Sequence, residues 1–276
     1  MPDVRPAAVA GMFYPSAPAA LAADVRAYLS RVVARPAETA AVPKALVVPH
    51  AGYVYSGPVA ASAYARLAAG RDPIRRVVRF GPTHRVPVRG LALPASRDFA
   101  TPLGTVSVDR ESVAAALTLP QVRESEAAHA FEHSLEVQLP FLQAVLGDFS
   151  IVPFAVGDAT PREVAEVIEL LWGGPETLFV VSSDLSHYHR YADACAIDRA
   201  TSEAILALSA TLDHEQACGA TPINGLLLAA RRRALRPELL DLRNSGDTAG
   251  DKSRVVGYAS FAFIEKSVSE TAHERS

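Results

Sequence analysis

The chain has 276 residues, a hydrophobic fraction of 49% and a formal net charge of -3. This length fits one domain with a large core. The near-balanced charge argues against a nucleic-acid or anionic-membrane partner, because both require concentrated lysine and arginine. Two cysteines cannot build a disulfide framework, and the chain contains neither a signal-peptide pattern nor an apolar run of about 18 residues. We therefore expect a cytoplasmic protein with one domain over residues 1–276 and a frayed end at 265–276.

Short apolar runs alternate with helical patterns along the chain. Strands are expected at 45–49, 76–80, 150–156, 177–181, 238–243 and 257–264, with a hairpin within 90–109. Helices are expected at 59–69, 131–146, 160–172, 191–208 and 222–233, with Thr160 as an N-cap and Pro161 at the first helical position. This alternation predicts an α/β fold: a three-layer α/β/α sandwich around a largely parallel mixed sheet.

Three histidines follow predicted strands. His50 comes directly after 45–49, His84 lies four residues after 76–80, and His187 lies six residues after 177–181. Ligands of open α/β sheets gather outside the carboxyl ends of the strands, so the three imidazoles are expected at one edge. A lone histidine is usually structural, but three at one edge favour metal binding or acid–base chemistry.

Two further groups have both a functional and a structural interpretation. Glu132, His133 and Glu136 would share a face of the helix predicted at 131–146. They would either hydrogen-bond metal-binding histidines or form a solvated helix face. Cys218 precedes a predicted helix, where the pKa of a thiol falls and the metal-binding thiolate is favoured. Cys195 lies in a helical run of small residues and is expected to be packed.

Five motifs, in this order, resemble the Memo family, known in bacteria and archaea as AmmeMemoRadiSam system protein B. They are Pro49-His50-Ala51-Gly52-Tyr53-Val54-Tyr55-Ser56-Gly57, Gly81-Pro82-Thr83-His84, Glu132-His133-Ser134-Leu135-Glu136, Ser182-Ser183-Asp184-Leu185-Ser186-His187 and Cys218-Gly219. The segments Ala10–Pro15 and Gly257-Tyr258 also fit, so the resemblance extends from about Arg5 to Glu265.

The resemblance implies a fold similar to class III extradiol ring-cleaving dioxygenases and one divalent transition-metal ion. It implies His50, His84 and Cys218 as the metal ligands, with iron favoured and copper or zinc as alternatives. His187 matches the acid–base histidine of the dioxygenases, and Asp184 matches a pocket residue beside it. Substrate contacts are expected from the aromatic side chains of Tyr55, Phe13 and Tyr53.

Three functions remain open from the sequence. The first is metal-dependent redox chemistry with O2 on a small, aromatic-type substrate, as in a non-haem dioxygenase-like oxidoreductase. The second is non-catalytic metal handling or partner docking beside the radical-SAM protein and the other protein of an AmmeMemoRadiSam system. The third is zinc-type hydrolysis, which needs three protein ligands and one open water position. A thiolate in place of a carboxylate ligand argues more strongly for the metal than for ring cleavage.

Overall fold

The computed structural model describes residues 3–32 and 41–265, and the predicted frayed end therefore lies outside the described residues except for Glu265. A nine-stranded mixed sheet has the order β10-β12-β2-β9-β3-β8-β4-β7, with β11 paired to β12. Its strands are β2 (Ala45–Val48), β3 (Arg76–Pro82), β4 (Leu91–Leu93), β7 (Val122–Glu124), β8 (Ser150–Val156), β9 (Thr177–Ser182), β10 (His187–His189), β11 (Arg236–Asn244) and β12 (Val255–Ile264). A separate small sheet joins β1 (Val4–Arg5), β5 (Asp98–Thr101) and β6 (Gly104–Ser107).

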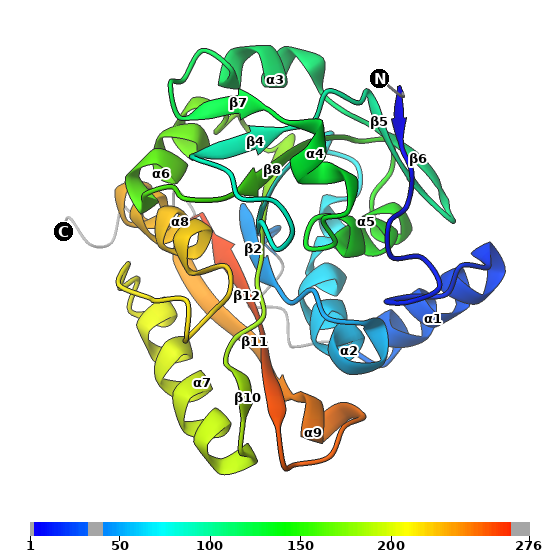
Figure 1. Cartoon of the computed structure of the whole chain (residues 1–276), viewed down its shortest axis with the longest axis vertical. Helices are drawn as coiled ribbons and strands as arrows, with labels where there is room; N and C mark the ends of the chain where they lie inside the picture. The colour runs from blue at the N-terminus through cyan, green and yellow to red at the C-terminus, as the bar shows by residue number, and fades with distance from the viewer. Residues whose placement is uncertain (1–2, 33–40, 266–276) are drawn as a thin grey trace.

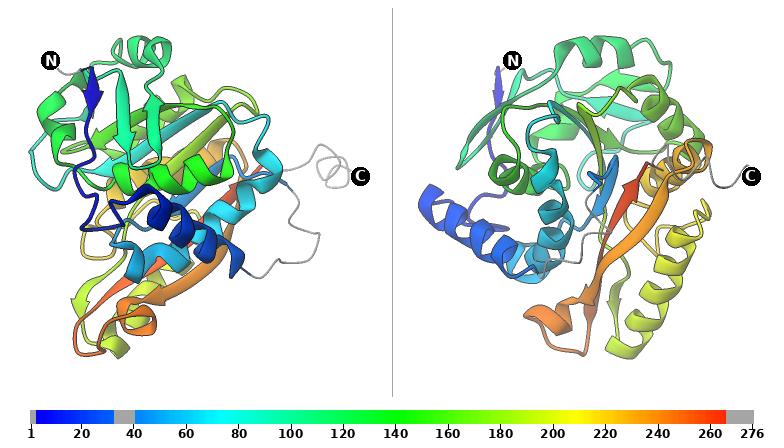
Figure 2. Two further views of the ribbon diagram at one scale, coloured as in Figure 1. Left: turned by 90° about the vertical axis from the view of Figure 1, so that its right-hand side faces the viewer. Right: turned by 180° about the vertical axis from the view of Figure 1, so that it is seen from behind.

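The predicted α/β sandwich is confirmed. Helices α1 (Pro18–Ser30), α2 (Tyr53–Tyr64) and α5 (Leu139–Val145) lie on one side of the sheet in Figure 1. Helices α6 (Pro161–Leu170), α7 (Tyr191–Leu206) and α8 (Ala220–Arg232) lie on the other side. The back view in Figure 2 shows the same separation. The remaining elements are η2 (Ala65–Gly70), α3 (Arg110–Ala116), α4 (Glu126–Ala130), η3 (Glu136–Gln138) and α9 (Ser245–Thr248).

The parallel part of the sheet is its centre. Strands β2, β9, β3 and β8 run parallel to their neighbours, whereas β12 pairs antiparallel with β2 and β4 pairs antiparallel with β8. All residues of β2 and β9 are buried, as expected for strands covered on both faces. One hydrophobic core extends from Val9 to Phe263. Among the described residues, no helix is long and apolar enough to cross a membrane.

The helix predicted at 131–146 is wrong. Helix α4 ends at Ala130, residues 131–135 are irregular, and helical backbone resumes in η3 and α5. Pro140 lies in the first turn of α5, where its missing N–H costs nothing, so a new helix starts there instead of continuing an older one. The helix start predicted at Thr160 is confirmed, because its hydroxyl accepts from the Glu163 amide in a capping box.

Candidate metal centre

Three neighbouring parallel strands place polar side chains at one edge of the sheet. His50, Asp184 and His84 each lie two residues beyond the last residue of β2, β9 and β3. These strands are adjacent in the order β2-β9-β3, so their carboxyl ends meet. The His50 amide donates to Asp184 Oδ1 at 2.7 Å, which fastens the first two loops together.

The irregular segment between α4 and η3 brings His133 to the same edge. It lies against the end of β3, where the Ser134 hydroxyl donates to the Pro82 carbonyl at 3.0 Å. A Cβ at Gly81 would lie only 2.5 Å from Ser134 Oγ, so this approach requires glycine. The missing helix at 131–135 is therefore what allows His133 to reach the histidines that follow the strands.

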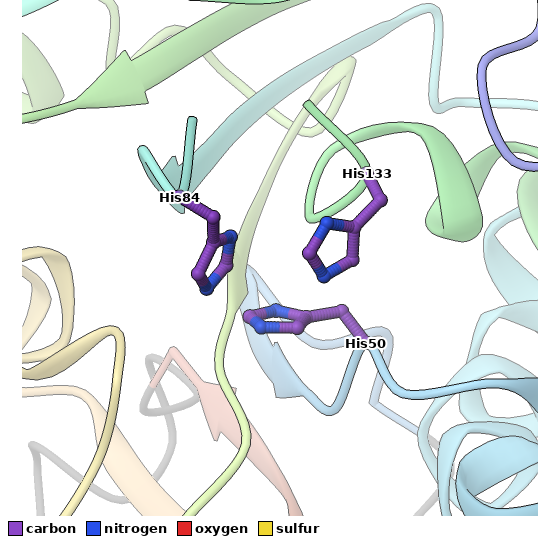
Figure 3. A group of neighbouring side chains, drawn as sticks. All are labelled: His50, His84 and His133. Atoms are coloured by element: carbon purple, nitrogen blue, oxygen red, sulfur yellow. The ribbon is translucent and has the colours of Figure 1, made fainter. Parts of the chain in front are cut away.

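His50, His84 and His133 converge on one point (Figure 3). One ring nitrogen from each lies within 4.8 Å of the other two. The ring centroids are 5.2 Å apart for His50–His84, 5.4 Å for His50–His133 and 4.6 Å for His84–His133. An ion bound at about 2.0–2.1 Å lies ~3.2 Å from a ring centroid, so rings at ~90–115° around it would have centroids ~4.5–5.4 Å apart. The three imidazoles thus fit one metal ion.

Hydrogen bonds fix the tautomer of His50. The Ser182 hydroxyl donates its single hydrogen to the Ser134 carbonyl at 2.6 Å and accepts from Gln138 Nε2 at 2.8 Å. Its remaining lone pair can only accept, so His50 Nδ1, at 2.9 Å, must carry a hydrogen and donate. His50 Nε2 is then left with the lone pair that a metal ion requires.

Gln138 is oriented in turn by Tyr64. The Tyr64 hydroxyl donates to Gln138 Oε1 at 2.7 Å, and this leaves the Gln138 amide nitrogen facing Ser182 and the Pro49 carbonyl. The chain of buried groups from Tyr64 through Gln138 to Ser182 therefore holds the His50 ring in the tautomer that can bind a metal ion.

Glu132 does the same for His84. Its Oε1 lies 2.9 Å from His84 Nδ1, and its Oε2 accepts from the His84 amide at 2.6 Å. Burial alone would raise the pKa of Glu132, but the hydrogen bonds from His84 and its neighbours bring the pKa to about 2. An ionised carboxylate only accepts, so His84 Nδ1 is the donor and Nε2 is free. The predicted orienting role of Glu132 therefore has a geometric basis, on irregular backbone instead of a helix.

Buried His50 and half-buried His133 are expected to be uncharged at neutral pH in the metal-free chain. Burial and the neighbouring His84 lower the pKa of His50 to about 3, and burial and His50 lower the pKa of His133 to about 4. Uncharged imidazoles are the form that binds metal ions.

Cys218 lies beside His50. Its Sγ is 3.3 Å from His50 Nε2, a separation that fits two donors on one ion, and it lies outside the three-histidine group. The turn is fastened by the Gly219 amide, which donates to Ser183 Oγ at 2.8 Å. The expectation of a lowered thiol pKa is wrong for the metal-free chain, because burial and the charge of Asp184 raise the pKa of Cys218 to about 12. The cation itself would have to stabilise the thiolate.

His187 and Asp184 are neighbours without a direct bond. Within the described residues, Asp184 accepts from the His50 amide, and no hydrogen bond joins it to His187. Burial raises the pKa of Asp184, and this rise is opposed by the His50 amide and by His187. Asp184 therefore fixes the His50 loop, while half-buried His187 at the start of β10 acts on it electrostatically.

Of the three aromatic residues predicted to contact substrate, Phe13 and Tyr55 are at least partly exposed, whereas Tyr53 is buried. Phe13 packs against His133 at 4.8 Å between ring centroids, and Tyr55 is 40% exposed. Tyr53 is buried, and its hydroxyl donates to the Val137 carbonyl at 2.7 Å, so it packs beneath the site instead of on an open surface.

Glu136 does not contact the histidines, and its predicted orienting role is wrong. Its carboxylate is fully buried and accepts hydrogen bonds from four donors of the N-terminal segment: Arg5 Nη1, the Ala8 and Val9 amides, and the Tyr14 hydroxyl. This difference follows from the broken helix. Glu132 contacts His84, whereas Glu136 contacts the N-terminal segment.

Removal of the Ser182 hydroxyl is expected to weaken metal binding. Ser182→Ala frees His50 to take the other tautomer and should lower metal affinity by about 10–100-fold without removing a ligand. Competition with a chromophoric chelator measures the affinity. Ser260→Ala is the matched control, since Ser260 Oγ is buried and has no hydrogen-bond partner among the described residues. Equal affinities in both variants would contradict the tautomer assignment.

The chain belongs to the Memo family. The family model described as Memo-like protein matches residues 5–262. A MEMO1 family protein of Sulfolobus acidocaldarius is 37% identical over 94% of this chain and 99% of its own length. A second, of Methanosarcina barkeri, is 39% identical over 93% and 98%, and a third, of Thermotoga petrophila, is 36% identical over 93% and 98%. The α/β architecture agrees with the dioxygenase-like fold expected for this family.

Proposed function

We propose that the chain binds one divalent transition-metal ion at the histidine cluster and uses it for redox chemistry with O2 on a small substrate. The convergence of His50, His84 and His133 supports this proposal most directly. Iron is the metal expected first, with copper and zinc as alternatives, because imidazole suits all three.

In this proposal Cys218 is a further ligand, beside His50. Its position next to Nε2 supports the role that the family resemblance implies. The three imidazoles and the Cys218 thiolate would hold the ion, and the positions that they do not occupy would be left for substrate and O2. The bound ion would supply electron transfer and Lewis acidity at these positions.

The residues around the ion would position the substrate and move its proton. His187 is our candidate for accepting a proton from a phenol-type hydroxyl, since it adjoins Asp184 and carries an accessible ring. Phe13 and the exposed Tyr55 would provide apolar contacts for a planar substrate.

Cys218→Ser tests the thiolate. Co(II)-loaded wild-type protein should show sulfur-to-metal charge-transfer absorption, which Cys218→Ser should lose and His133→Ala should retain at higher metal concentration. Cys195→Ser is the control, because Cys195 lies on α7 and its Sγ accepts from Asn244. Wild-type protein that binds Co(II) without this absorption would exclude Cys218 as a ligand.

O2 consumption tests the enzymatic part of the proposal. Protein loaded anaerobically with Fe(II) should consume O2 faster with a catechol or phenol panel than without it. His187→Ala should bind metal normally and lower that rate by about 10²–10⁴-fold. If His187→Ala loses metal as His50→Ala does, His187 is a ligand and not a proton acceptor.

Metal handling beside the radical-SAM and other proteins of an AmmeMemoRadiSam system is the second candidate function. The observation favouring it is the nearby sulfur donor, since a thiolate suits metal retention as well as catalysis. Tight stoichiometric metal without O2 consumption on any substrate would select it.

A further inference from the structure

An open pocket lies near the ends of β10 and α7, elements that Figure 1 shows at the lower end of the molecule. It has a volume of about 690 Å³ and is formed where β10 ends, α7 begins and the chain enters β12. Three cations line it, Arg190, Lys252 and Arg254, together with the rings of Tyr188 and Tyr191. The sequence alone does not reveal this group, because Arg190 and Lys252 are 62 positions apart.

The three cations have no carboxylate partner within the described residues, since none of their nitrogens lies within 4.0 Å of a carboxylate oxygen. Some other surface arginines are paired, as Arg233 is with Glu169 and Arg243 with Asp241. Asp247 and Asp251, on the same connection, accept instead from the Tyr191 hydroxyl and the Ser253 amide, both at 2.7 Å. The pocket thus offers positive charge that the chain does not use itself.

Aromatic rings hold two of these cations, Lys252 and Arg254, in place. Lys252 Nζ lies 4.3 Å from the centroid of the Tyr191 ring, and the Arg254 guanidinium carbon lies 5.2 Å from the centroid of Tyr188. Tyr188 is 64% exposed, so it adds apolar surface next to the charges. Positive groups beside an open aromatic ring suit an organic anion better than a bare inorganic ion.

The backbone at Tyr188 is strained. Its φ is +62°, a left-handed value that costs energy for an aromatic residue and persists only where the surrounding structure imposes it. The pairing of β10 with β12 shifts register between His187 and His189, on either side of Tyr188. This strain turns Tyr188 to the pocket while the preceding residue, His187, stays in the ladder opposite Val256.

The pocket is linked to the candidate metal centre through His187. The rings of His187 and Tyr188 are 5.9 Å apart between their centroids, and the charge of His187 acts on the pKa of Asp184, which follows β9. A molecule held against Tyr188 therefore has His187 next to it.

We infer that the pocket formed by Arg190, Lys252, Arg254, Tyr188 and Tyr191 binds a small organic anion, with its carboxylate or phosphate on the cations and its apolar body on the Tyr188 ring. The inference that the pocket binds an anion does not depend on the proposed function. That the bound molecule is the substrate of the neighbouring centre rests on the proposed function, and there the pocket would anchor the end of the substrate that does not react.

Titration with benzoate, acetate and inorganic phosphate, followed by amide chemical shifts, tests the inference. Benzoate should bind more tightly than acetate or phosphate, shift the amides around Tyr188 and weaken as ionic strength rises. The double variant K252Q/R254Q should lose at least tenfold in benzoate affinity. R26Q/R199Q removes the same charge from exposed positions on α1 and α7 and should bind benzoate as wild type does.

The same titration on His50→Ala separates this pocket from the metal. Unchanged benzoate binding in His50→Ala supports the inference even if the metal proposal fails. Loss of binding in His50→Ala but not in K252Q/R254Q would place the anion on the metal and overturn the inference. Equal affinities of K252Q/R254Q and R26Q/R199Q would overturn it as well, and equal binding of acetate and benzoate would exclude the role of the tyrosine ring.

Discussion

His50→Ala is expected to lower metal affinity by at least about 100-fold and leave a folded protein. His50 is the central donor, since its Nε2 faces both the histidine cluster and Cys218 Sγ. Loss of a ligand should cost more than the 10–100-fold typical of residues that only orient ligands. The core does not depend on the metal, because the strands around the site are buried against one another. Metal content after dialysis and chelator competition measure the effect.

His129→Ala is the matched control for this experiment. His129 is also a buried histidine, 1% exposed, and its Nε2 is 2.9 Å from the Ala92 carbonyl, outside the cluster. Its removal leaves a similar cavity and should leave metal binding intact. Circular dichroism establishes that both variants are folded. If His50→Ala keeps stoichiometric metal while folded, the centre is not where we place it.

Much of the fold and part of the site follow from sequence because they depend on local pattern. Apolar runs identify central strands such as β8, and the position of His50 and His84 after such strands predicts that they meet. An apolar run, or a run in which apolar and polar residues alternate, can be recognised in the sequence without knowing which distant residues it packs against. The parallel order β2-β9-β3 then brings His50 and His84, 34 positions apart in the chain, to one edge of the sheet.

The parts that sequence reasoning missed depend on distant partners. The 131–146 pattern is helical in composition, yet Pro140 begins a new helix and the Gly81–Ser134 contact holds the preceding segment open. The sequence predicts His133 either to orient a metal-binding histidine or to lie on a solvated helix face, and the structure places it in the cluster itself. Gly81 and Ser182 both stand in motifs that resemble the family. The close contact at Gly81 and the partners of the Ser182 hydroxyl, at positions 50, 134 and 138, cannot be recognised from one chain.

Glu136 binds the N-terminal segment instead of orienting a histidine. It lies where the N-terminal segment crosses η3 and forms a buried ion pair with Arg5 at 2.7 Å, with side chains 1% and 0% exposed. The same segment carries Phe13, which packs on His133. The Glu136 carboxylate therefore fixes the N-terminal segment, and this segment places Phe13 against His133 of the candidate metal site.

Glu136→Gln is therefore expected to destabilise the fold by about 3–5 kcal/mol, the usual cost when one member of a buried pair is removed and the other stays charged. The two carboxylate oxygens each accept from two donors, Arg5 Nη1 and the Ala8 amide on one, the Val9 amide and the Tyr14 hydroxyl on the other. An amide group replaces one oxygen with a donor in either orientation, so two donors always lose their acceptor.

Urea unfolding followed by circular dichroism measures this loss as a lower midpoint with an unchanged slope. Glu124→Gln is the control, because Glu124 is exposed on β7 and its replacement should change the free energy of unfolding by no more than about 0.5 kcal/mol. Since the Arg5 charge is the reason for the cost, Arg5→Met combined with Glu136→Leu should recover much of the stability lost by Glu136→Gln. If Glu136→Gln unfolds at the wild-type midpoint, the N-terminal segment is not held by this carboxylate, and the connection from Glu136 through Phe13 to His133 does not exist.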